Sequence, residues 1–323
     1  MRVSVRVPAS SANLGPGYDS FGLALGMHSA FSAEVAEEWS VEISGEGSGA
    51  LPHDERNPVV SAMKHVFAEA GEPGRAASVT CANGIPLGQG LGSSASAIVG
   101  GMLLADAMCD APLGRERIFE MATEVEGHPD NVAAVLLGGM TVSWTGDRMR
   151  CASVGPACGL AAVLVFSDEP LATTDSRHLL PESVPHADAA RNTAWSGVLA
   201  AGMALGDPDL IAQGLHDCIH EPYRAEAIPD LAHVRDALVD AGALGAVLSG
   251  AGPAVMGLVH GEDDDAGDPH ALQLSVEVRN RSLSNCAGNF LHLLVSGWRG
   301  FHPSSQNDGE HHASDSYQRA YQR

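Results

Sequence analysis

The sequence predicts a protein of mixed helices and strands that is large enough to form two lobes. Its 323 residues can bury a sizeable core, and 45% of them are hydrophobic against 18% charged, which is ordinary for a globular enzyme. Short alternating segments typical of strands lie near the N-terminus. Longer segments with apolar residues at helical spacing follow, so we expect both kinds of element to share the core.

The net charge and the cysteine spacing of the chain indicate which binding partners and which cellular compartment to expect. The formal net charge is −22, whereas nucleic acids and anionic membranes attract basic surfaces. The six cysteines form no C-x-x-C pair, so reduced cysteines are expected. The N-terminus lacks the apolar core of a signal peptide, and the charge-free run 241–259 is broken by five glycines and a proline. We therefore expect a cytoplasmic protein with no nucleic-acid or membrane partner.

The most informative stretch is glycine-rich and spans residues 85–97, inside a region that stays charge-free as far as Ala105. Glycines at 88, 90 and 92 let the backbone approach a ligand closely. Ser93 and Ser94 follow where a helix would begin, and serine is a favoured N-cap. The N-terminus of a helix presents free N–H groups and favours negative charge. This stretch therefore predicts a phosphate-binding loop.

Three alternatives to this interpretation can be compared on spacing. A P-loop needs a lysine just before the helix, and the only lysine of the chain is Lys64. A dinucleotide fingerprint needs G-x-G-x-x-G and an acid about 20 residues further on. Here the spacing is G-x-G-x-G, and the candidate acid Asp110 lies in a turn. A tight turn before a core helix, with no ligand, is the third alternative.

A second polar cluster lies at E-G-H-P-D-N, residues 126–131. A carboxylate beside a phosphate loop would repel the phosphates unless Mg²⁺ lay between them, and this ion binds through one or two carboxylates plus phosphate oxygens. Glu126 is therefore a candidate metal ligand. Pro129 favours an extended residue before it, and Asp130 or Asn131 can then cap a short helix that runs toward Leu137. Capping is the preferred interpretation for Asp130.

The remaining elements follow from periodicity and turn residues. Asn57 and Pro58 are typical of a helix start, and Gly71 of a helix end. The boundary between the lobes is expected near residues 146–147 or 155–156. We expect strands at 1–7, 27–35, 39–43, 140–144, 160–166, 243–248 and 254–259, an ordered loop at 8–17, and helices at 57–71, 113–125, 187–205, 208–215, 228–240 and about 270–283. The polar segment from Ser304 onward is typical of disorder.

Six motifs together resemble the GHMP kinases. Residues 86–95 fit the ATP loop of this family, P-x-x-x-G-L-G-S-S-A, at every fixed position. The stretch 8–19, P-A-S-S-A-N-L-G-P-G-Y-D, and E-G-H-P-D-N are similar to the homoserine branch of the family. Residues 173–181, H-E-P-Y-R at 220–224 and S-G-A-G-P at 249–253 are similar to further family segments. The resemblance covers about residues 1–260.

The resemblance implies an α+β fold in two lobes, with the active site between them. Residues 1–150 would form the N-terminal lobe with the ATP loop, residues 151–262 the C-terminal lobe, and residues 263–323 an atypical, partly disordered tail. The implied reaction transfers a phosphoryl group from ATP to the side-chain hydroxyl of L-homoserine, on the route to threonine. A kinase for another small alcohol and an inactive ligand-binding homologue remain alternatives, and a homodimer is left open.

The resemblance also implies roles at the nucleotide end of the site. Ser94 and Glu126 would bind Mg²⁺. Asn131, with His128 beside it, would align the substrate hydroxyl, and Thr173 would lie near the phosphoryl group. No residue stands out as a strong general base. ATP would bind along Pro86, Leu87, Gly88, Gln89, Gly90, Leu91, Gly92, Ser93, Ser94, Ala95 and Ser96.

At the amino-acid end, the resemblance implies a pocket for a zwitterion. Asp19 would meet the ammonium group of the substrate, and Asn13 would line the pocket beside it. Arg177 and Arg224 would together bind the carboxylate, a geometry that lysine could not reproduce. Gly252, in the third glycine turn, would support the substrate from the second lobe.

Overall fold

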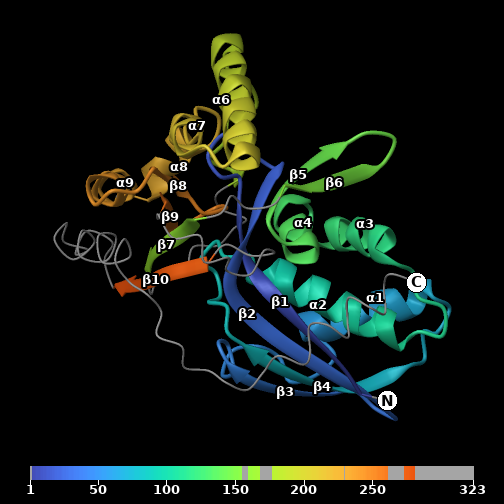
Figure 1. Ribbon diagram of the computed structural model, residues 1–323. Coiled ribbons are helices and arrows are strands. Elements are labelled where there is room, and N and C mark those ends of the chain that lie inside the picture. The colour runs from blue at the N-terminus through green and yellow to red at the C-terminus, as the bar shows by residue number, and fades with distance from the viewer. Residues whose placement is uncertain (1, 155–158, 168–176, 229, 261–272, 281–323) are drawn as a thin grey trace.

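The computed structural model describes residues 2–154, 159–167, 177–228, 230–260 and 273–280 (Figure 1). Two sheets organise these residues, one of six strands and one of four, and both carry helices. The protein therefore has the mixed helix and strand content that the sequence predicts. Within the described residues, none of the helices combines the length and the apolar character that crossing a membrane requires.

The first sheet contains strands β1 to β6 in the order β3-β4-β2-β5-β6, with β1 paired to β2. All its pairings are antiparallel except that of β3 with β4. β2 is the central strand, because it pairs with β1, β4 and β5. The strands are β1 (Arg2–Ala12), β2 (Phe21–Ala36), β3 (Ser40–Gly45), β4 (Ala76–Asn83), β5 (Met140–Thr145) and β6 (Met149–Val154).

The expectation of a loop from Pro8 is wrong for its first part, because β1 continues to Ala12. The register with β2 shifts between Pro8 and Ala9, which marks a bulge, and the strand then resumes its pairing. Ser10 and Ser11 can lie in this buried strand because Asn131 and Ser249 provide hydrogen-bond partners for their hydroxyl groups. The turn at Gly146 joins β5 to β6, so the first sheet extends to Val154.

Helices α1 to α4 pack on the first sheet and against each other. Asn57 caps α1 by accepting a hydrogen bond from the backbone N–H of Val59, which confirms the predicted helix start. The predicted helix at 113–125 begins at Arg115 in the structure. Val125 lies at helical spacing from the buried Ile118 and Ala122, but it is exposed. The four helices are α1 (Pro58–Glu69), α2 (Ser93–Met108), α3 (Arg115–Glu126) and α4 (Asp130–Leu137).

The second sheet has the order β10-β7-β9-β8. The expectation of a helix at about 270–283 is wrong, because residues 273–280 form β10, parallel to β7. Leu274, Val276 and Val278 alternate with polar residues, which is the period of a strand. The strands are β7 (Leu160–Ser167), β8 (Gly245–Leu248), β9 (Val255–His260) and β10 (Gln273–Asn280).

Helices α6 to α9 accompany the second sheet (Figure 1). Their bounds are α6 (His186–Leu205), α7 (Pro208–Gly214), α8 (Glu221–Arg224) and α9 (Leu231–Asp240), with the short 3₁₀ turn η1 (Ala225–Ala227) after α8. One apolar cluster spans both sheets, since Leu23 and Met140 of the first pack in the same group as Leu164 and Met256 of the second. This shared core fixes the turns that approach each other from the two sheets. The predicted tail beyond residue 280 lies outside the described residues.

Candidate active site

A cavity lies where turns from the two sheets meet, and most of the predicted site residues line it. Its walls come from the β1–β2 connection, the glycine loop before α2, the α3–α4 connection and the turn between β8 and β9. Its lining residues include Asn13, Asp19, Gly88, Gly90, Leu91, Gly92, Ser93, Ser94, Glu126, His128, Asp130, Asn131, Arg177, Arg224, Gly250 and Ala251.

A larger hollow, of about 400 Å³, lies at strands β2, β3 and β4. Arg6, His28, Ser44 and Asn83 line it, and it shares none of the described residues that line the cavity above. The smaller cavity is therefore the candidate active site, because it gathers the glycine loop, the carboxylates and the arginines.

The glycine loop approaches the cavity in a left-handed conformation at three alternate positions. The φ angles of Gly88, Gly90 and Gly92 are 67°, 76° and 66°. Gly92 is the N-cap of α2, and no side chain in the described part of the chain caps the helix. The expectation that serine caps α2 is therefore wrong, because Ser93 already lies inside the helix. The first-turn N–H groups and the positive end of the helix dipole face the loop, as a phosphate site requires.

Packing explains why glycine is needed at two of these positions. A Cβ atom on Gly90 would lie 2.3 Å from the carbonyl oxygen of Ser249 in the opposite turn. On Gly92 it would lie 2.0 Å from Oγ of Ser10 and 3.0 Å from Oδ1 of Asn131. These glycines therefore allow the loop to approach the second-sheet turn and the α4 residues, in addition to adopting positive φ.

Ser94 and Glu126 lie together at the N-terminus of α2. The Ser94 hydroxyl donates to Oε2 of Glu126 at 2.8 Å. Burial raises the pKa of Glu126, and the nearby Asp130 raises it further, while the Ser94 hydrogen bond and His128 oppose the shift. A partly desolvated carboxylate beside a helix N-terminus is a suitable ligand for a cation that also binds phosphate. In the part of the chain that the structure describes, no group of three or more His, Cys, Asp or Glu side chains could hold a metal ion.

Asp130 orients His128 and does not act as the side-chain cap that the sequence suggests. The N-cap of α4 is Pro129, and Asp130 is the first residue of the helix. Oδ1 of Asp130 accepts from Nδ1 of His128 at 2.8 Å and from the backbone N–H of Asn131 at 2.6 Å. Burial by itself lowers the pKa of His128, but Asp130 and Glu126 outweigh it, so the pKa is raised. The Asp130 bond leaves Nε2 of His128 as the ring atom for a ligand.

Asn131, in α4, is fixed by a contact with β1 of the first sheet. Its Oδ1 accepts from the hydroxyl of Ser10 at 2.8 Å, and both side chains are buried. Because the amide oxygen is occupied, the amide nitrogen is the group that remains for a ligand in the cavity. Asn131 can therefore donate a hydrogen bond to an oxygen atom of a substrate.

Asp19 and Arg177 form a two-point ion pair at the other end of the cavity. Nη2 of Arg177 donates to Oδ1 of Asp19 at 2.7 Å, and Nη1 donates to Oδ2 at 3.0 Å. Nη1 of Arg177 also donates to the hydroxyl of Tyr18 at 2.9 Å. The guanidinium of Arg224 lies 5.5 Å from the Tyr18 ring and that of Arg177 lies 5.6 Å from it. One acid and two arginines thus surround the same aromatic side chain.

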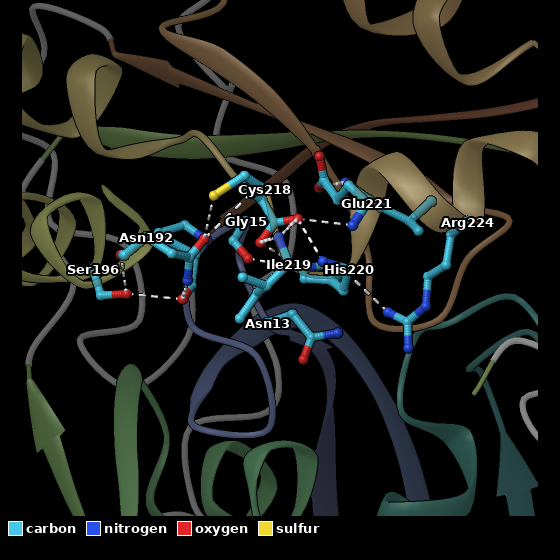
Figure 2. Close-up of polar contacts among 12 residues, drawn as sticks. Asn13, Gly15, Asn192, Ser196, Cys218, Ile219, His220, Glu221 and Arg224 are labelled. Atoms are coloured by element: carbon cyan, nitrogen blue, oxygen red, sulfur yellow. Dashed lines mark hydrogen bonds and ion pairs between the residues drawn. The ribbon is translucent and has the colours of Figure 1, made fainter. Parts of the chain in front are cut away.

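Arg224 is buried and only partly satisfied. Its Nη1 donates to the carbonyl oxygen of Gly250 at 3.0 Å. The same atom donates to Nδ1 of His220 at 3.0 Å (Figure 2). Its Nε has no hydrogen-bond partner among the described residues, although it is buried. Burial lowers the pKa of Arg224, while Tyr18 and Asp19 oppose the shift. A buried cation with an unused donor is suited to binding an anionic group.

The loop that carries Asn13 and Asp19 has a left-handed backbone at residues that bear side chains, and Leu14 disfavours this conformation most. Asn13, Leu14 and Asp19 have φ angles of 70°, 51° and 53°, in the left-handed region. Residues of α6 and of the turn between β8 and β9 hold it there. Asn13 donates to the Gly250 carbonyl at 2.9 Å. The Pro16 carbonyl accepts from Asn192 at 2.7 Å and from Ser196 at 2.8 Å, and Figure 2 shows the Asn192 and Ser196 side chains.

Some predicted residues do not line the cavity. Ser96 uses its hydroxyl on the Pro8 carbonyl at 2.7 Å, and Ala95 is buried in the core. Gly252 follows the lining residues Gly250 and Ala251, and its Cβ direction faces Ile228 and Leu248. Thr173 lies outside the described residues.

Sequence reasoning missed the role of Asp130 in the cavity. It also missed Tyr18, which contacts Arg177, and Asn192 and His220, which lie behind the cavity. Asp130 carried a signal, since an acid two residues after His128 can reach its ring. His220 belongs to the H-E-P-Y-R motif but was given no role. Asn192 carried no signal, because it lies in an ordinary helix and its partner is 176 residues away.

The fold agrees with comparisons to known proteins. The GHMP kinases N terminal domain matches residues 57–139, and the GHMP kinases C terminal domain matches residues 185–274. The chain therefore belongs to the GHMP kinase family. The second match continues past residue 260, where the resemblance was expected to stop.

Within that family, the chain is similar to homoserine kinases. It is 41% identical to the homoserine kinase of Streptomyces coelicolor over 81% of this chain and 86% of that protein. It is 40% identical to the homoserine kinase of Streptomyces avermitilis over 87% of this chain and 95% of that protein. The crystal structure of homoserine kinase from Cytophaga hutchinsonii superposes with a TM-score of 0.72 at 29% identity, covering 80% of this chain and 85% of that one.

Proposed function

We propose that this protein transfers the γ-phosphoryl group of ATP to the side-chain hydroxyl of L-homoserine and so makes O-phospho-L-homoserine, on the route to threonine. The observation that carries the proposal is the composition of the cavity. A helix N-terminus suited to phosphate lies at one end of it, and Asp19, Arg177 and Arg224 lie at the other. Relatives that are about 40% identical over most of the chain and are named homoserine kinase support the same substrate.

The glycine loop would hold the nucleotide. The backbone N–H groups from Gly88 to Ser94 would bind its phosphates, and residues 86–96 would form the wall along which ATP lies. Ser94 and Glu126 would hold Mg²⁺, which supplies positive charge to the phosphates when bound. An ion at this place would take its remaining ligands from phosphate and water, as Mg²⁺ commonly does.

Phosphoryl transfer depends mainly on positioning and charge neutralisation. In the proposed reaction the homoserine hydroxyl oxygen forms a bond to the γ-phosphorus, and the bond from that phosphorus to the leaving oxygen of ADP breaks. The proton of the hydroxyl group is released to the solvent. The amide nitrogen of Asn131 and Nε2 of His128 would hold the hydroxyl oxygen in line. Asp130 would keep the His128 ring oriented, and Thr173 would act near the phosphoryl group.

The amino-acid end of the cavity would bind the charged groups of homoserine. Its ammonium would pair with Asp19, and its carboxylate would pair with Arg177 and with the unused Nε of Arg224. Without substrate, Asp19 and Arg177 bind each other, and both side chains are more than one-third exposed. A zwitterion would replace this one ion pair with a pair at each end, so the cost of opening it is small.

We further infer that residues 1–150 and 151–262 act as the two lobes of the enzyme, and that it works in the cytoplasm. Charge supports the second point, because the formal net charge of −22 suits a soluble protein. A homodimer remains open.

A coupled assay of ADP release tests the proposal. Homoserine, mevalonate and galactose are compared as acceptors at equal ATP, and turnover is expected with homoserine. Arg177→Ala and Arg224→Lys should each raise the KM for homoserine by about 10- to 100-fold, because a charged hydrogen bond contributes about 1.5–3 kcal/mol. Lysine cannot restore the planar fork of arginine. Absence of ADP release with homoserine, or wild-type KM in both variants, would overturn the assignment.

A further inference from the structure

His220 lies behind the candidate active site and is completely buried (Figure 2). It does not line the cavity, yet its ring contacts two elements that do. Nε2 of His220 lies 2.7 Å from the carbonyl oxygen of Gly15, in the loop that carries Asn13 and Asp19. Nδ1 of the same ring lies 3.0 Å from Nη1 of Arg224. The ring therefore joins the two ends of the amino-acid pocket.

The chemistry of these partners determines the state of the ring. A carbonyl oxygen only accepts hydrogen bonds, so Nε2 of His220 carries the proton that it donates to Gly15. A guanidinium only donates, so Nδ1 must keep its lone pair to accept from Arg224. Both contacts require the same neutral tautomer. A protonated ring would present N–H to the guanidinium of Arg224 and lose that hydrogen bond.

The backbone around His220 is fixed independently of the ring. The carboxylate of Asp217 accepts from the N–H groups of Ile219, His220 and Glu221 at 3.2, 2.9 and 2.7 Å. The buried carboxylate of Glu221 accepts from the N–H of Leu248 at 2.6 Å and from Arg235 at 2.7 Å. The backbone of His220 is therefore fixed by Asp217 and Glu221. The loss of either ring hydrogen bond should then shift the partner of that bond, which is the Gly15 loop or Arg224.

Charged groups on the neighbouring elements surround this ring. Arg224 contacts it directly, and the Tyr18 ring lies 5.4 Å from it, centre to centre. Oδ1 of Asp217 lies 3.8 Å from Nε2, beyond hydrogen-bond distance. Asp19 also acts on the ring through its charge. The Gly15 and Arg224 contacts are thus the two directional bonds at the ring.

We propose that His220 is a positioning residue that sets the recognition of both ends of the amino-acid substrate, holding the guanidinium of Arg224 through Nδ1 and the Asp19 loop through Nε2. This inference rests on the proposed function, since Arg224 and Asp19 are the groups proposed to bind the carboxylate and the ammonium. In this proposal His220 contacts neither the substrate nor the nucleotide. It fixes the positions of the two charged side chains, Arg224 and Asp19, that bind the substrate.

Two substitutions separate the two bonds of His220. In His220→Asn the amide oxygen can take the place of Nδ1 and accept from Arg224, while the bond to Gly15 is lost. In His220→Gln the amide nitrogen can take the place of Nε2 and donate to Gly15, while the bond to Arg224 is lost. His233→Gln is the matched control, because His233 is exposed on α9 and lies outside the cavity.

The readout is the preference for homoserine over two truncated acceptors, measured as the ratio of kcat/KM values. The acceptors are 3-aminopropan-1-ol, which lacks the carboxylate, and 4-hydroxybutanoate, which lacks the amine. His220→Gln should lose about tenfold of its preference over the amino alcohol and keep its preference over the hydroxy acid, since one hydrogen bond to a charged group is lost. His220→Asn should show the opposite pattern. Equal loss in both variants, or no loss in either, would overturn the proposal, because simple destabilisation does not depend on the acceptor.

A second measurement tests the positioning role without any substrate. Nitrogen-15 spectra of histidine and arginine side chains should show His220 as the neutral Nε2–H tautomer and Arg224 with slow exchange at the Nη group bonded to it. The Nη1 signal of Arg224 should keep its chemical shift in His220→Asn and change it in His220→Gln, where Nη1 keeps its bond to Gly250 and loses the one to the ring. An Nδ1–H tautomer, or titration near pH 6.5 as for a free histidine, would overturn the inference. If the wild type fails to phosphorylate homoserine, the proposed function falls, and these spectra decide the positioning role alone.

Discussion

The two loops that meet at the cavity reach left-handed backbone conformations in different ways. The loop before α2 does so at glycines, Gly88, Gly90 and Gly92. The loop after β1 does so at Asn13, Leu14 and Asp19, which carry side chains. Glycine adopts positive φ without steric cost, whereas other residues adopt it at a cost that the surrounding structure must offset.

The two loops differ in which residues determine their left-handed backbone conformation. The glycine loop is specified largely by its own sequence. The Asn13–Asp19 loop is specified by residues far away in the chain, because Asn192, Ser196 and His220 hold the carbonyl groups of Pro16 and Gly15. Changes inside the first loop should therefore be the most damaging, and the second loop should respond to changes outside itself.

The largest effect is expected from Gly90→Ala. The new Cβ would lie 2.3 Å from the Ser249 carbonyl and would also be forced into positive φ, so we expect a loss of stability on the order of 3 kcal/mol or more, with ATP turnover abolished. Gly71→Ala is the control, since its φ is 80° and nothing lies within 4 Å of its Cβ direction. It should cost about 1 kcal/mol from φ alone. Urea unfolding of both variants measures the difference, and equal losses would show that packing against Ser249 is unimportant.

Glu126→Gln tests whether metal binding at the nucleotide end of the cavity can be weakened without altering homoserine binding at the amino-acid end. The amide keeps an oxygen near Ser94 but loses the negative charge proposed to hold Mg²⁺, so kcat should fall about 100-fold. The KM for homoserine should stay near its wild-type value. Glu124→Gln, at an exposed position of the same helix, should leave turnover unchanged. Near-normal turnover of the Glu126 variant at limiting Mg²⁺ would remove the residue from this role.

Asn192→Ala tests the external support of the second loop. The buried Asn192 side chain donates to Pro16 and accepts from the backbone N–H of Cys218. Its loss should cost about 2 kcal/mol, because the Cys218 N–H loses this acceptor and the Pro16 carbonyl keeps only Ser196. The KM for homoserine should rise several times more than the KM for ATP. Thr193→Ala provides a neighbouring exposed control, because Thr193 bonds only within its own helix. If Asn192→Ala loses stability but keeps its KM for homoserine, the support of the loop by α6 does not affect substrate binding.

The pH dependence of stability should show opposite contributions from His220 and Glu221. Burial lowers the pKa of His220 to about 4 from an ordinary 6.5, so its contribution is present above pH 6.5 and is lost as the pH falls toward 4. Burial raises the pKa of Glu221 to about 7 from 4.5, so its contribution is present below pH 4.5 and is lost as the pH rises toward 7. Each slope approaches about 1.4 kcal/mol per pH unit at most.

Single substitutions of His220 and Glu221 should each remove one of these two contributions to the dependence of stability on pH. Relative to wild type, His220→Gln should lose less stability on acidification, and Glu221→Gln should lose less as the pH rises from 4.5 to 7. Urea unfolding at several pH values measures both. The constant cost of breaking the Glu221–Arg235 pair shifts one curve without changing its slope. Parallel curves for all three proteins would contradict the assigned titrations.

The sequence allowed prediction of the parts of the site that are local. The positive φ of Gly88, Gly90 and Gly92, the helix after them and the caps at Asn57 follow from residue chemistry within a few positions. The α+β fold and the GHMP family followed from motifs and were confirmed. The roles of Ser94, Glu126 and Asn131 stay predictions, although all three line the cavity.

What could not be predicted depends on contacts between distant residues. The strand that ends at Ala12 contains serines typical of a loop, and only partners such as Asn131 and Ser249 make them acceptable there. The pairing of β10 with β7 joins residues more than a hundred positions apart, and a helical interpretation of residues 270–283 overlooked its alternation. The contact from Asn192 to Pro16 spans 176 positions, so no local pattern announces it.

The external support of the Asn13–Asp19 loop has a consequence for redesign of the enzyme. Helix α6 hydrogen-bonds this loop through the Pro16 carbonyl, which accepts from Asn192 and Ser196, and neither of these side chains lines the cavity. Directed evolution toward a longer or shorter hydroxy amino acid therefore has targets that leave every proposed ligand-binding group in place. Libraries at positions 192 and 196 should move Asp19 relative to the arginines, and selection on α6 would then change acceptor length while the phosphate loop is left alone.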